Sequence, residues 1–414
     1  MSRPTDKKYS YLRLSFLVPL SVLILAIFLS RSFPRLALFA GQLKPFSTTV
    51  NNMSSQIPMY QKELEIALLA VQRAAQLTKR VFHEKAKGTV SKDDKSPVTI
   101  GDFGAQALII SALKANFPED EIVGEEDADE LRSEAGKGLR DQIWELVKST
   151  KLADANSESR LGGPVKDEDA MLDLIDFGNS EGGAHGRIWT IDPIDGTKGF
   201  LRGGQYAVCL ALLVDGDVKV GVLGCPNLPV DDSAPLDSNI GANQTDEGRG
   251  VIFSAVQGLG ATSRPLTTGP LSLQGQRIAM KAIPDGDMSK ACFCESVEAG
   301  HSNQSESAQI AKKLGITKPS VRMDSQAKYG SIARGAGDIY LRLPTSETYQ
   351  EKIWDHAAGD LIVREAGGQV TDTLGKRLDF SKGRTLAENK GVVAARAEVH
   401  GKVLKAVQEV IGQK

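Results

Sequence analysis

The chain has 414 residues, of which 41% are hydrophobic and 25% charged, with 50 Lys and Arg against 52 Asp and Glu. This composition excludes a collagen, a disulfide-stapled mini-protein and a disordered tail, and the length suggests two domains or one large two-part enzyme. The net charge of −2, without a long basic run, argues against nucleic-acid binding through phosphate contacts and favours small-molecule partners.

The N-terminal extension, residues 1–55, has competing interpretations. Residues 14–30 are uncharged and lie between two arginines, a pattern typical of a marginal signal-anchor. The flanking basic and hydroxyl residues, with Asp6 as the sole acid before Glu63, are equally typical of a mitochondrial transit peptide. A third interpretation is an untranslated extension of a soluble protein. The expected location is therefore mitochondrial or cytoplasmic, with a membrane contact through residues 14–30 as the alternative.

The next segment is expected to be helical. Between residues 58 and 87, apolar residues recur at steps of three and four, which predicts one long helix with a single buried stripe. The string SPVTIGD reads as a turn, after which a second helix is expected over residues 103–116. EIVGEED then predicts a short strand that ends in an acidic turn.

Residues 127–187 are charged and irregular, and we expect an insertion or lid with a helix only near residues 142–146. IWTI at residues 188–191 predicts a strand. Two apolar, β-rich runs joined by Asp215-Gly216 then predict a hairpin, because Asp-Gly suits the tight turns that connect antiparallel strands.

The second half alternates strands with helices. After a Gly/Ser/Thr-rich stretch to about residue 270, we expect strands at 277–282 and 338–343, and helices at 306–314, 356–366 and 403–411. This order is typical of an α/β architecture. The predicted division is an N-terminal extension (1–55), an α+β domain with an antiparallel sheet (56–268) and an α/β domain (269–414). The four cysteines lack paired spacing and are expected to be buried thiols without a metal.

The string WTIDPIDGTKGF carries the strongest chemical signal. Asp192 and Asp195 flank a proline that stiffens the backbone, so one rigid turn presents two carboxylates. Hard divalent cations such as Mg²⁺ prefer oxygen ligands, and the carbonyl of Ile194 could add one more. Gly196 and Thr197 could open a helix whose free N–H groups attract phosphate oxygens. Taken alone, the motif is more often an ordinary Asp-Gly turn.

Other acids occur where elements start or end: Asp102, Glu125, Glu126 and Asp355. Each has an ordinary explanation, because Asp102 and Asp355 could cap the helices that follow them and adjacent glutamates often form a solvated face. Small residues after Asp355 would allow a helix to pack closely, and Gly367-Gly368 would provide a left-handed stop. These acids together make a shared cation site more probable than any one of them alone.

GEE, DPIDGT and WDHAAGDLIVREAGG, in this order and spacing, resemble the signature of the inositol monophosphatase superfamily of lithium-sensitive, Mg²⁺-dependent phosphatases. The resemblance runs from about residue 58 to the end. It implies a layered α-β-α-β-α fold of the sugar-phosphatase type. Further strings, among them IDFGNSEGG, GCPNL, GHS, DSQAKY and YQEKIWDHAAG, resemble the fungal 3′(2′),5′-bisphosphate nucleotidase branch.

The resemblance implies a role for each matching residue. Glu125, Asp192, the Ile194 carbonyl, Asp195 and Asp355 match metal ligands for two or three Mg²⁺, most of them in the 56–268 domain. Asp102 matches the residue that, with Thr197, orients the attacking water. The residues that match substrate contacts are Gly196, Thr197, His301, Ser325, Lys328 and Arg342.

The implied activity is hydrolysis of the 3′-phosphate of adenosine 3′,5′-bisphosphate (PAP) to AMP, and of its sulfated relative PAPS. Such an enzyme would protect sulfate assimilation and support salt tolerance. An inositol phosphate 1-phosphatase of the same superfamily is the alternative. A non-catalytic sensor on the same scaffold is disfavoured, because it would be expected to lose a metal carboxylate. No obligate protein partner is expected.

Overall fold

The computed structural model describes residues 59–86, 96–234, 236, 247–298, 300, 302–346 and 348–412. The extension at residues 1–55 therefore lies outside the described residues, and so does the apolar segment 14–30. Within the described ranges, no helix combines the length and apolar character needed to cross a membrane. The remainder of the chain, from Pro58 onwards, forms a compact unit by itself.

The first half of this unit is built on a seven-stranded sheet with the strands in chain order. β1 pairs with β2 in parallel, and every later neighbour is antiparallel. The predicted hairpin is confirmed, with Asp215 and Gly216 at positive φ in its turn. The strands are β1 Glu121–Gly124, β2 Arg187–Asp195, β3 Ala207–Val214, β4 Asp217–Pro229, β5 Arg249–Val256, β6 Gly260–Pro265 and β7 Gln276–Arg277.

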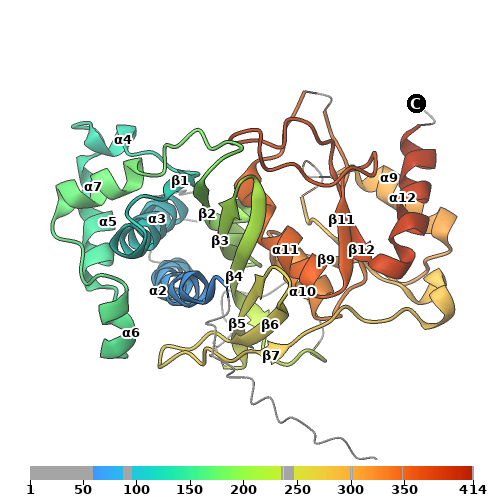
Figure 1. Ribbon diagram of the computed structural model, residues 1–414, viewed down its shortest axis with the longest axis horizontal. Helices are drawn as coiled ribbons and strands as arrows, with labels where there is room; N and C mark the ends of the chain where they lie inside the picture. The colour runs from blue at the N-terminus through green and yellow to red at the C-terminus, as the bar shows by residue number, and fades with distance from the viewer. Residues whose placement is uncertain are drawn as a thin grey trace, which may run out of the picture. The chain divides into compact units, whose positions relative to one another are not determined.

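Two long helices, α2 (Gln61–Ala86) and α3 (Ser96–Asn116), cover one face of this sheet (Figure 1). The predicted stripe on α2 is confirmed: Leu68, Val71 and Ala75 are fully buried against α3 and the sheet. The predicted turn at SPVTIGD is wrong, because α3 already begins at Ser96. A proline in the first helical turn costs no hydrogen bond, so Pro97 is compatible with helix.

Four helices fill the region that we expected to be a mostly irregular lid. They are α4 (Asp129–Arg132), α5 (Lys137–Ser149), α6 (Ala155–Arg160) and α7 (Glu168–Asp176). Only α5 was predicted. α5 and α7 pack against α3, and their apolar residues Ile143, Val147 and Ile175 join one buried cluster. The expectation of a lid is therefore wrong, since this region forms an outer helical layer.

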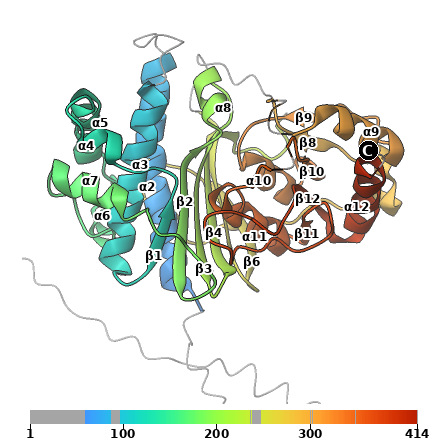
Figure 2. The same ribbon diagram turned by 90° about the horizontal axis from the view of Figure 1, so that it is seen from above.

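A second sheet of five strands has the order β11-β12-β10-β8-β9. Helices α10 (Ala327–Ala333) and α11 (Ala357–Glu365) lie between the two sheets, whereas α9 (Gln304–Leu314) and α12 (Ala397–Ile411) lie on the outer side (Figures 1 and 2). The expected α-β-α-β-α layering is confirmed. The strands are β8 Phe293–Glu295, β9 Val321–Arg322, β10 Ile339–Arg342, β11 Gly368–Thr371 and β12 Val392–Arg396.

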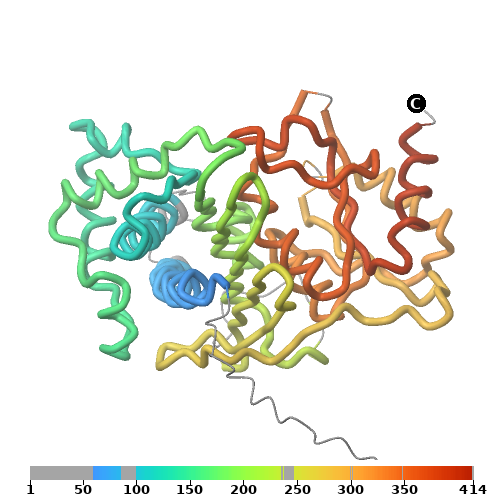
Figure 3. Tube along the Cα trace, in the orientation of Figure 1, coloured from blue at the N-terminus to red at the C-terminus, as the bar shows by residue number. Residues whose placement is uncertain are grey.

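The sequence patterns were least informative for short or glycine-rich elements. The Gly/Ser/Thr-rich stretch contains β5 and β6, and the strand expected at 277–282 is reduced to the two residues of β7. Helix α12 starts at Ala397, earlier than predicted. The trace in Figure 3 follows the chain from the first sheet through these segments into the second.

Candidate active site

The site begins where β2 ends in DPIDG. Residues three apart on a regular strand face opposite sides of the sheet. The pairing of β2 with β3 shifts between Asp192 and Asp195, so that an irregularity interrupts the strand at Pro193 and Ile194. This extra residue brings both carboxylates to the same pocket, as β-bulges near active sites commonly do.

A short helix, α8 (Thr197–Arg202), follows at once, as predicted. Gly196 precedes it with φ 89°, a conformation that side-chain-bearing residues rarely adopt. A Cβ at this position would lie 2.9 Å from the Cβ of Ser325. Glycine is therefore required both for the backbone turn and for the close approach of the loop that precedes α10.

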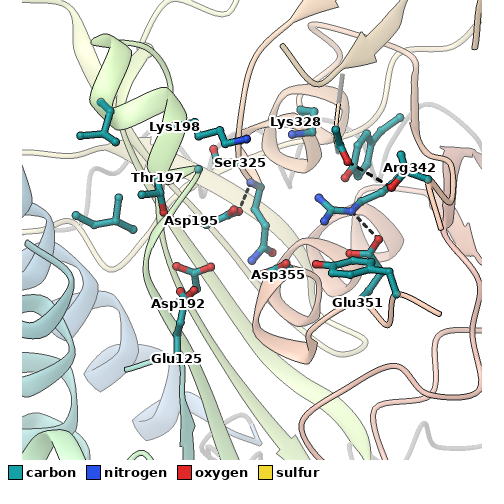
Figure 4. Close-up of a pocket in the computed structure, with 18 of the residues that line it drawn as sticks. Glu125, Asp192, Asp195, Thr197, Lys198, Ser325, Lys328, Arg342, Glu351 and Asp355 are labelled. Atoms are coloured by element: carbon teal, nitrogen blue, oxygen red, sulfur yellow. Dashed lines mark hydrogen bonds and ion pairs between the residues drawn. The ribbon is translucent and has the colours of Figure 1, made fainter. Parts of the chain in front are cut away.

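A pocket of about 560 Å³ opens between the end of β2, the start of α10, the end of β10 and the segment before α11 (Figure 4). Carboxylates gather on one side of it and basic groups on another. The lining residues are Glu125, Asp192, Ile194, Asp195, Gly196, Thr197, Lys198, Leu201, Gly300, Ser325, Gln326, Lys328, Tyr340, Arg342, Leu343, Thr345, Tyr349, Glu351 and Asp355.

The carboxylate side of the pocket could hold a metal ion. Oxygen atoms of Asp192, Asp195 and Asp355 lie within 4.8 Å of one another. Asp192 is 2% exposed, and its Oδ1 has no hydrogen-bond partner in the described structure. A buried carboxylate oxygen without a donor is costly unless a cation satisfies it, and hard oxygen donors suit Mg²⁺.

Crowding of these acids perturbs their ionisation. Burial, together with the charges of Glu125 and Asp195, raises the pKa of Asp192 well above its usual range. Burial and the charge of Asp355 raise the pKa of Glu125 to about 8 and that of Asp195 to about 6. Because the carboxylates cannot all be ionised together without a compensating cation, the cluster is matched to a multivalent metal.

Asp102 lies inside α3 rather than at its start, so the interpretation as a helix cap is wrong. It is buried beneath the pocket, where a hydrogen bond with the Ile194 backbone ties it to the DPIDG turn. Burial and the charges of Glu126 and Glu125 raise the pKa of Asp102 well above its usual range. Among the described residues its Oδ1 has no hydrogen-bond partner, so this carboxyl retains an unused acceptor there.

Asp355 does not cap α11 either, because His356 occupies the N-cap position and Asp355 ends the preceding 3₁₀ turn. The small residues that follow allow the close packing we expected. A Cβ at Gly359 would lie 2.2 Å from the Tyr329 ring, so α11 can approach α10 only with glycine there. Gly367 ends the helix at φ 89°, as predicted.

Two basic side chains face the acids across the pocket. Lys328, on α10, is buried with its Nζ 5.3 Å from the centre of the Tyr340 ring. Burial lowers the pKa of Lys328, although Asp195 and Asp324 oppose this effect. Arg342, at the end of β10, donates from Nε to Glu351 Oε1 at 2.7 Å. This arrangement can receive a second anionic group beside the acidic cluster.

Ten of the twelve predicted site residues line this pocket, and Asp102 lies directly beneath it. His301 is outside the described residues. The residue patterns missed nine further lining residues, among them Lys198, Tyr340, Tyr349 and Glu351. Glu351 belongs to YQEKIWDHAAG, the string that also contains the predicted metal ligand Asp355. Its place in that string could have identified Glu351 as a site residue. The others carry no distinguishing local pattern.

Comparisons with known proteins agree with this geometry. A model of the inositol monophosphatase family matches residues 59–412. A 3′(2′),5′-bisphosphate nucleotidase from Emericella nidulans is 65% identical over 353 residues, which cover 85% of this chain and 99% of that protein. A 3′(2′),5′-bisphosphate nucleotidase from Schizosaccharomyces pombe is 50% identical, with coverages of 85% and 96%. An inositol monophosphatase structure from Anabaena matches with a TM-score of 0.50 at 18% identity, covering 84% and 96%, which concerns the fold alone.

Proposed function

The chain belongs to the inositol monophosphatase family, and from this premise we infer that it is a 3′(2′),5′-bisphosphate nucleotidase. The reaction is hydrolysis of the 3′-phosphate of PAP to give AMP and phosphate, with PAPS as a second substrate. The observation that carries this inference is the single pocket that combines the acidic cluster with Lys328 and Arg342. A substrate with two phosphate groups needs both the acidic side and the basic side of this pocket.

The acidic side would hold two or three Mg²⁺ through Glu125, Asp192, Asp195, Asp355 and the Ile194 carbonyl. When bound, such ions lower the pKa of a water molecule and offset the charge of the phosphoryl group and the leaving oxygen. Without a cation, the carboxylates would repel a phosphate dianion. We therefore expect almost no activity in the absence of Mg²⁺.

The remaining steps belong to side chains and backbone groups of the chain. Thr197 is exposed in the pocket, where its hydroxyl can orient the attacking water. Asp102, which is hydrogen-bonded with the Ile194 backbone, would accept the proton of that water. The backbone amides after Gly196, at the start of α8, would donate to the phosphoryl oxygens. The reaction needs no covalent intermediate on the protein.

The basic side selects the substrate. Lys328 offers a point charge, whereas the guanidinium of Arg342 offers a planar set of donors that matches phosphate oxygens. Ser325 lies beside Gly196, with its backbone at φ 69°. We assign these three residues to the second phosphate and the nucleoside, and His301 to the nucleoside as well.

The direct test is to measure phosphate release from PAP, PAPS and inositol 1,4-bisphosphate with and without Mg²⁺. The proposal requires Mg²⁺-dependent hydrolysis of PAP that is faster than hydrolysis of inositol 1,4-bisphosphate. Faster cleavage of the inositol phosphate would favour the inositol phosphatase alternative. The absence of hydrolysis of all three would contradict the enzyme assignment.

We also propose that the enzyme is mitochondrial or cytoplasmic, with a membrane anchor through residues 14–30 as the alternative, and that residues 1–55 take no part in catalysis. In support, the family match begins at residue 59, and residues 14–30 are uncharged between basic flanks. Fusion of residues 1–55 to a fluorescent reporter, followed by imaging and alkaline extraction, separates imported, cytosolic and membrane-anchored fates. Fluorescence that stays in the membrane after alkaline extraction would contradict the proposal and favour the membrane-anchored alternative.

A further inference from the structure

A continuous chain of hydrogen bonds lies behind Arg342. Glu351 accepts from Arg342 Nε at 2.7 Å through one oxygen, and its other oxygen lies 3.2 Å from His356 Nε2. His356 Nδ1 lies in turn 2.8 Å from the Tyr329 hydroxyl. His356 and Tyr329 are each 1% exposed and the Glu351 side chain is 9% exposed, so water does not compete for these bonds.

Glu351 forms hydrogen bonds with both of its neighbours in this chain. Burial alone would raise the pKa of Glu351, but His356 and Arg342 outweigh it and hold the pKa at about 2. As an anion, Glu351 can only accept, so His356 Nε2 must donate to it. The other ring nitrogen, Nδ1, lies at hydrogen-bond distance from the Tyr329 hydroxyl. One carboxylate oxygen of Glu351 therefore bonds to Arg342 and the other to His356.

The backbone around Glu351 is also held in place. Its carbonyl accepts from Leu386 N at 2.8 Å, and the neighbouring Ile353 N donates to Arg384 O at 3.2 Å. Arg342 itself ends β10, paired with Val392 of β12. The backbone is therefore fixed at both Glu351 and Arg342. Because of this, the hydrogen bond from Arg342 Nε to Glu351 can orient the planar guanidinium group.

Several negative charges act on the Arg342 guanidinium. Arg342 interacts with the charge of Asp355, and Asp195 with that of Arg342, so the acidic cluster attracts the guanidinium. Glu351 supplies a further negative charge at hydrogen-bond distance, with a carboxylate oxygen within 4.8 Å of one of Asp355. The hydrogen bond to Glu351 uses Nε, and the guanidinium, which also interacts with Tyr340 and Tyr349, lines the pocket (Figure 4).

We propose that Glu351, braced by His356 and Tyr329, is a positioning residue that holds Arg342 toward the second phosphate and thereby sets the preference for bisphosphorylated substrates. The proposal rests on the function inferred above and adds a specificity determinant to it. Glu351 does not touch the reacting phosphoryl group in this account. Its effect passes through Arg342.

The test compares Glu351→Gln with the wild type on two substrates, PAP and adenosine 3′-monophosphate, which share the reacting phosphate. Glutamine keeps the size of the side chain but removes its charge. We expect the ratio of kcat/KM for PAP to that for the monophosphate to fall by about tenfold or more, mainly through KM for PAP, because a charged hydrogen bond is lost. Tyr329→Phe, which removes only the hydroxyl, should shift the ratio in the same direction by a smaller factor.

A double-mutant cycle separates positioning from a general loss of structure. In an Arg342→Ala background, Glu351→Gln should change the ratio by less than about twofold, because the group that it positions is gone. Glu398→Gln is the matched control: Glu398 forms an exposed pair with Arg396 outside the pocket. An equal loss on both substrates, or the same effect of Glu351→Gln with and without Arg342, would overturn the proposal.

AMP binding measured by calorimetry in the presence of Mg²⁺ gives a readout without turnover. Glu351→Gln should weaken it by a factor similar to the rise in KM for PAP, and unchanged AMP affinity would contradict the proposal. If the wild type releases no phosphate from PAP, the inferred function fails. If it does so and the variants show no change in substrate ratio, only the positioning role fails.

Discussion

The carboxyl groups of Asp192 and Asp355 approach closely enough to share one cation, although they come from different layers of the fold. Asp192 lies on β2 of the seven-stranded sheet and Asp355 ends the turn before α11, yet their oxygens lie within 4.8 Å of each other and of Asp195. The site is therefore assembled across the contact between sheet and helix. Whether the site forms therefore depends on the contact between sheet and helix as well as on each acidic residue.

Arg342→Ala tests the basic side of the pocket. Loss of charge-assisted hydrogen bonds worth about 1.5–3 kcal/mol should raise KM for PAP by roughly 10- to 150-fold. KM for adenosine 3′-monophosphate should change far less. Steady-state kinetics on both substrates provides the measurement, with Arg396→Ala, outside the pocket, as the control. Equal effects on both substrates would remove Arg342 from the second phosphate site.

Thr197→Val and Asp102→Asn test the proton-transfer assignment. Each should lower kcat by about 10²- to 10⁴-fold, because positioned acid–base groups contribute that much, whereas KM should change little. Thr317→Val, at an exposed position that does not line the pocket, provides a control for the loss of a threonine hydroxyl. A large rise in KM at constant kcat would instead make these residues substrate contacts.

Gly196→Ala tests the backbone geometry of the phosphate-binding turn. Alanine is strained at φ 89°, and its Cβ would lie 2.9 Å from that of Ser325. We expect a loss of about 1–3 kcal/mol in the free energy of unfolding, together with reduced activity. Chemical denaturation measures the first quantity. Gly138→Ala, where a Cβ meets nothing within 4 Å, should be close to neutral.

Asp217 should make stability depend on acid pH. Its carboxylate accepts from Lys219 at 2.9 Å, Gln257 at 2.7 Å and Arg377 at 2.6 Å. Burial would raise the pKa, but these partners lower it to about 2. Since the folded-state pKa lies below the unfolded one, the stabilisation is present above about pH 4 and is lost as pH falls toward 2.

The measurement is the difference in unfolding free energy between the wild type and Asp217→Asn. Allowing for partial exposure, it should be on the order of 1–2 kcal/mol at pH 7 and should shrink below about pH 4. Asp141→Asn, at an exposed position on α5, should show no such trend. A difference that grows as the pH falls would contradict the assignment.

Residue patterns predicted the long and strongly periodic elements, because their burial repeats along the chain. The α2 stripe and the Asp215-Gly216 hairpin are examples. Residue patterns failed to predict the elements whose formation depends on tertiary contacts. Helices α4, α6 and α7 are short and charged, and they pack against other helices: α7 against α3, α4 against α5 and α6 against α2. Pro97 misled the prediction at the start of α3 because proline marks a turn and a first helical turn equally well.

The acidic half of the site was predictable because its ligands sit in distinctive strings. The basic half was less so, since Lys328 and Arg342 lie in segments without unusual local composition and matched only through family resemblance. Glu351 illustrates the remaining limit. Its partner Arg342 belongs to another strand, and nothing in the chain before folding indicates that the two side chains meet.

Asp192→Asn gives the most direct test of the central claim that the gathered carboxylates hold the metal on which hydrolysis depends. Mg²⁺ affinity, measured by calorimetry, should fall sharply, and turnover of PAP and of adenosine 3′-monophosphate should both drop by more than about 10³-fold, since several kcal/mol of transition-state stabilisation are lost. Asp287→Asn, at the surface, should retain both properties. Metal binding and turnover that survive in Asp192→Asn would contradict the account.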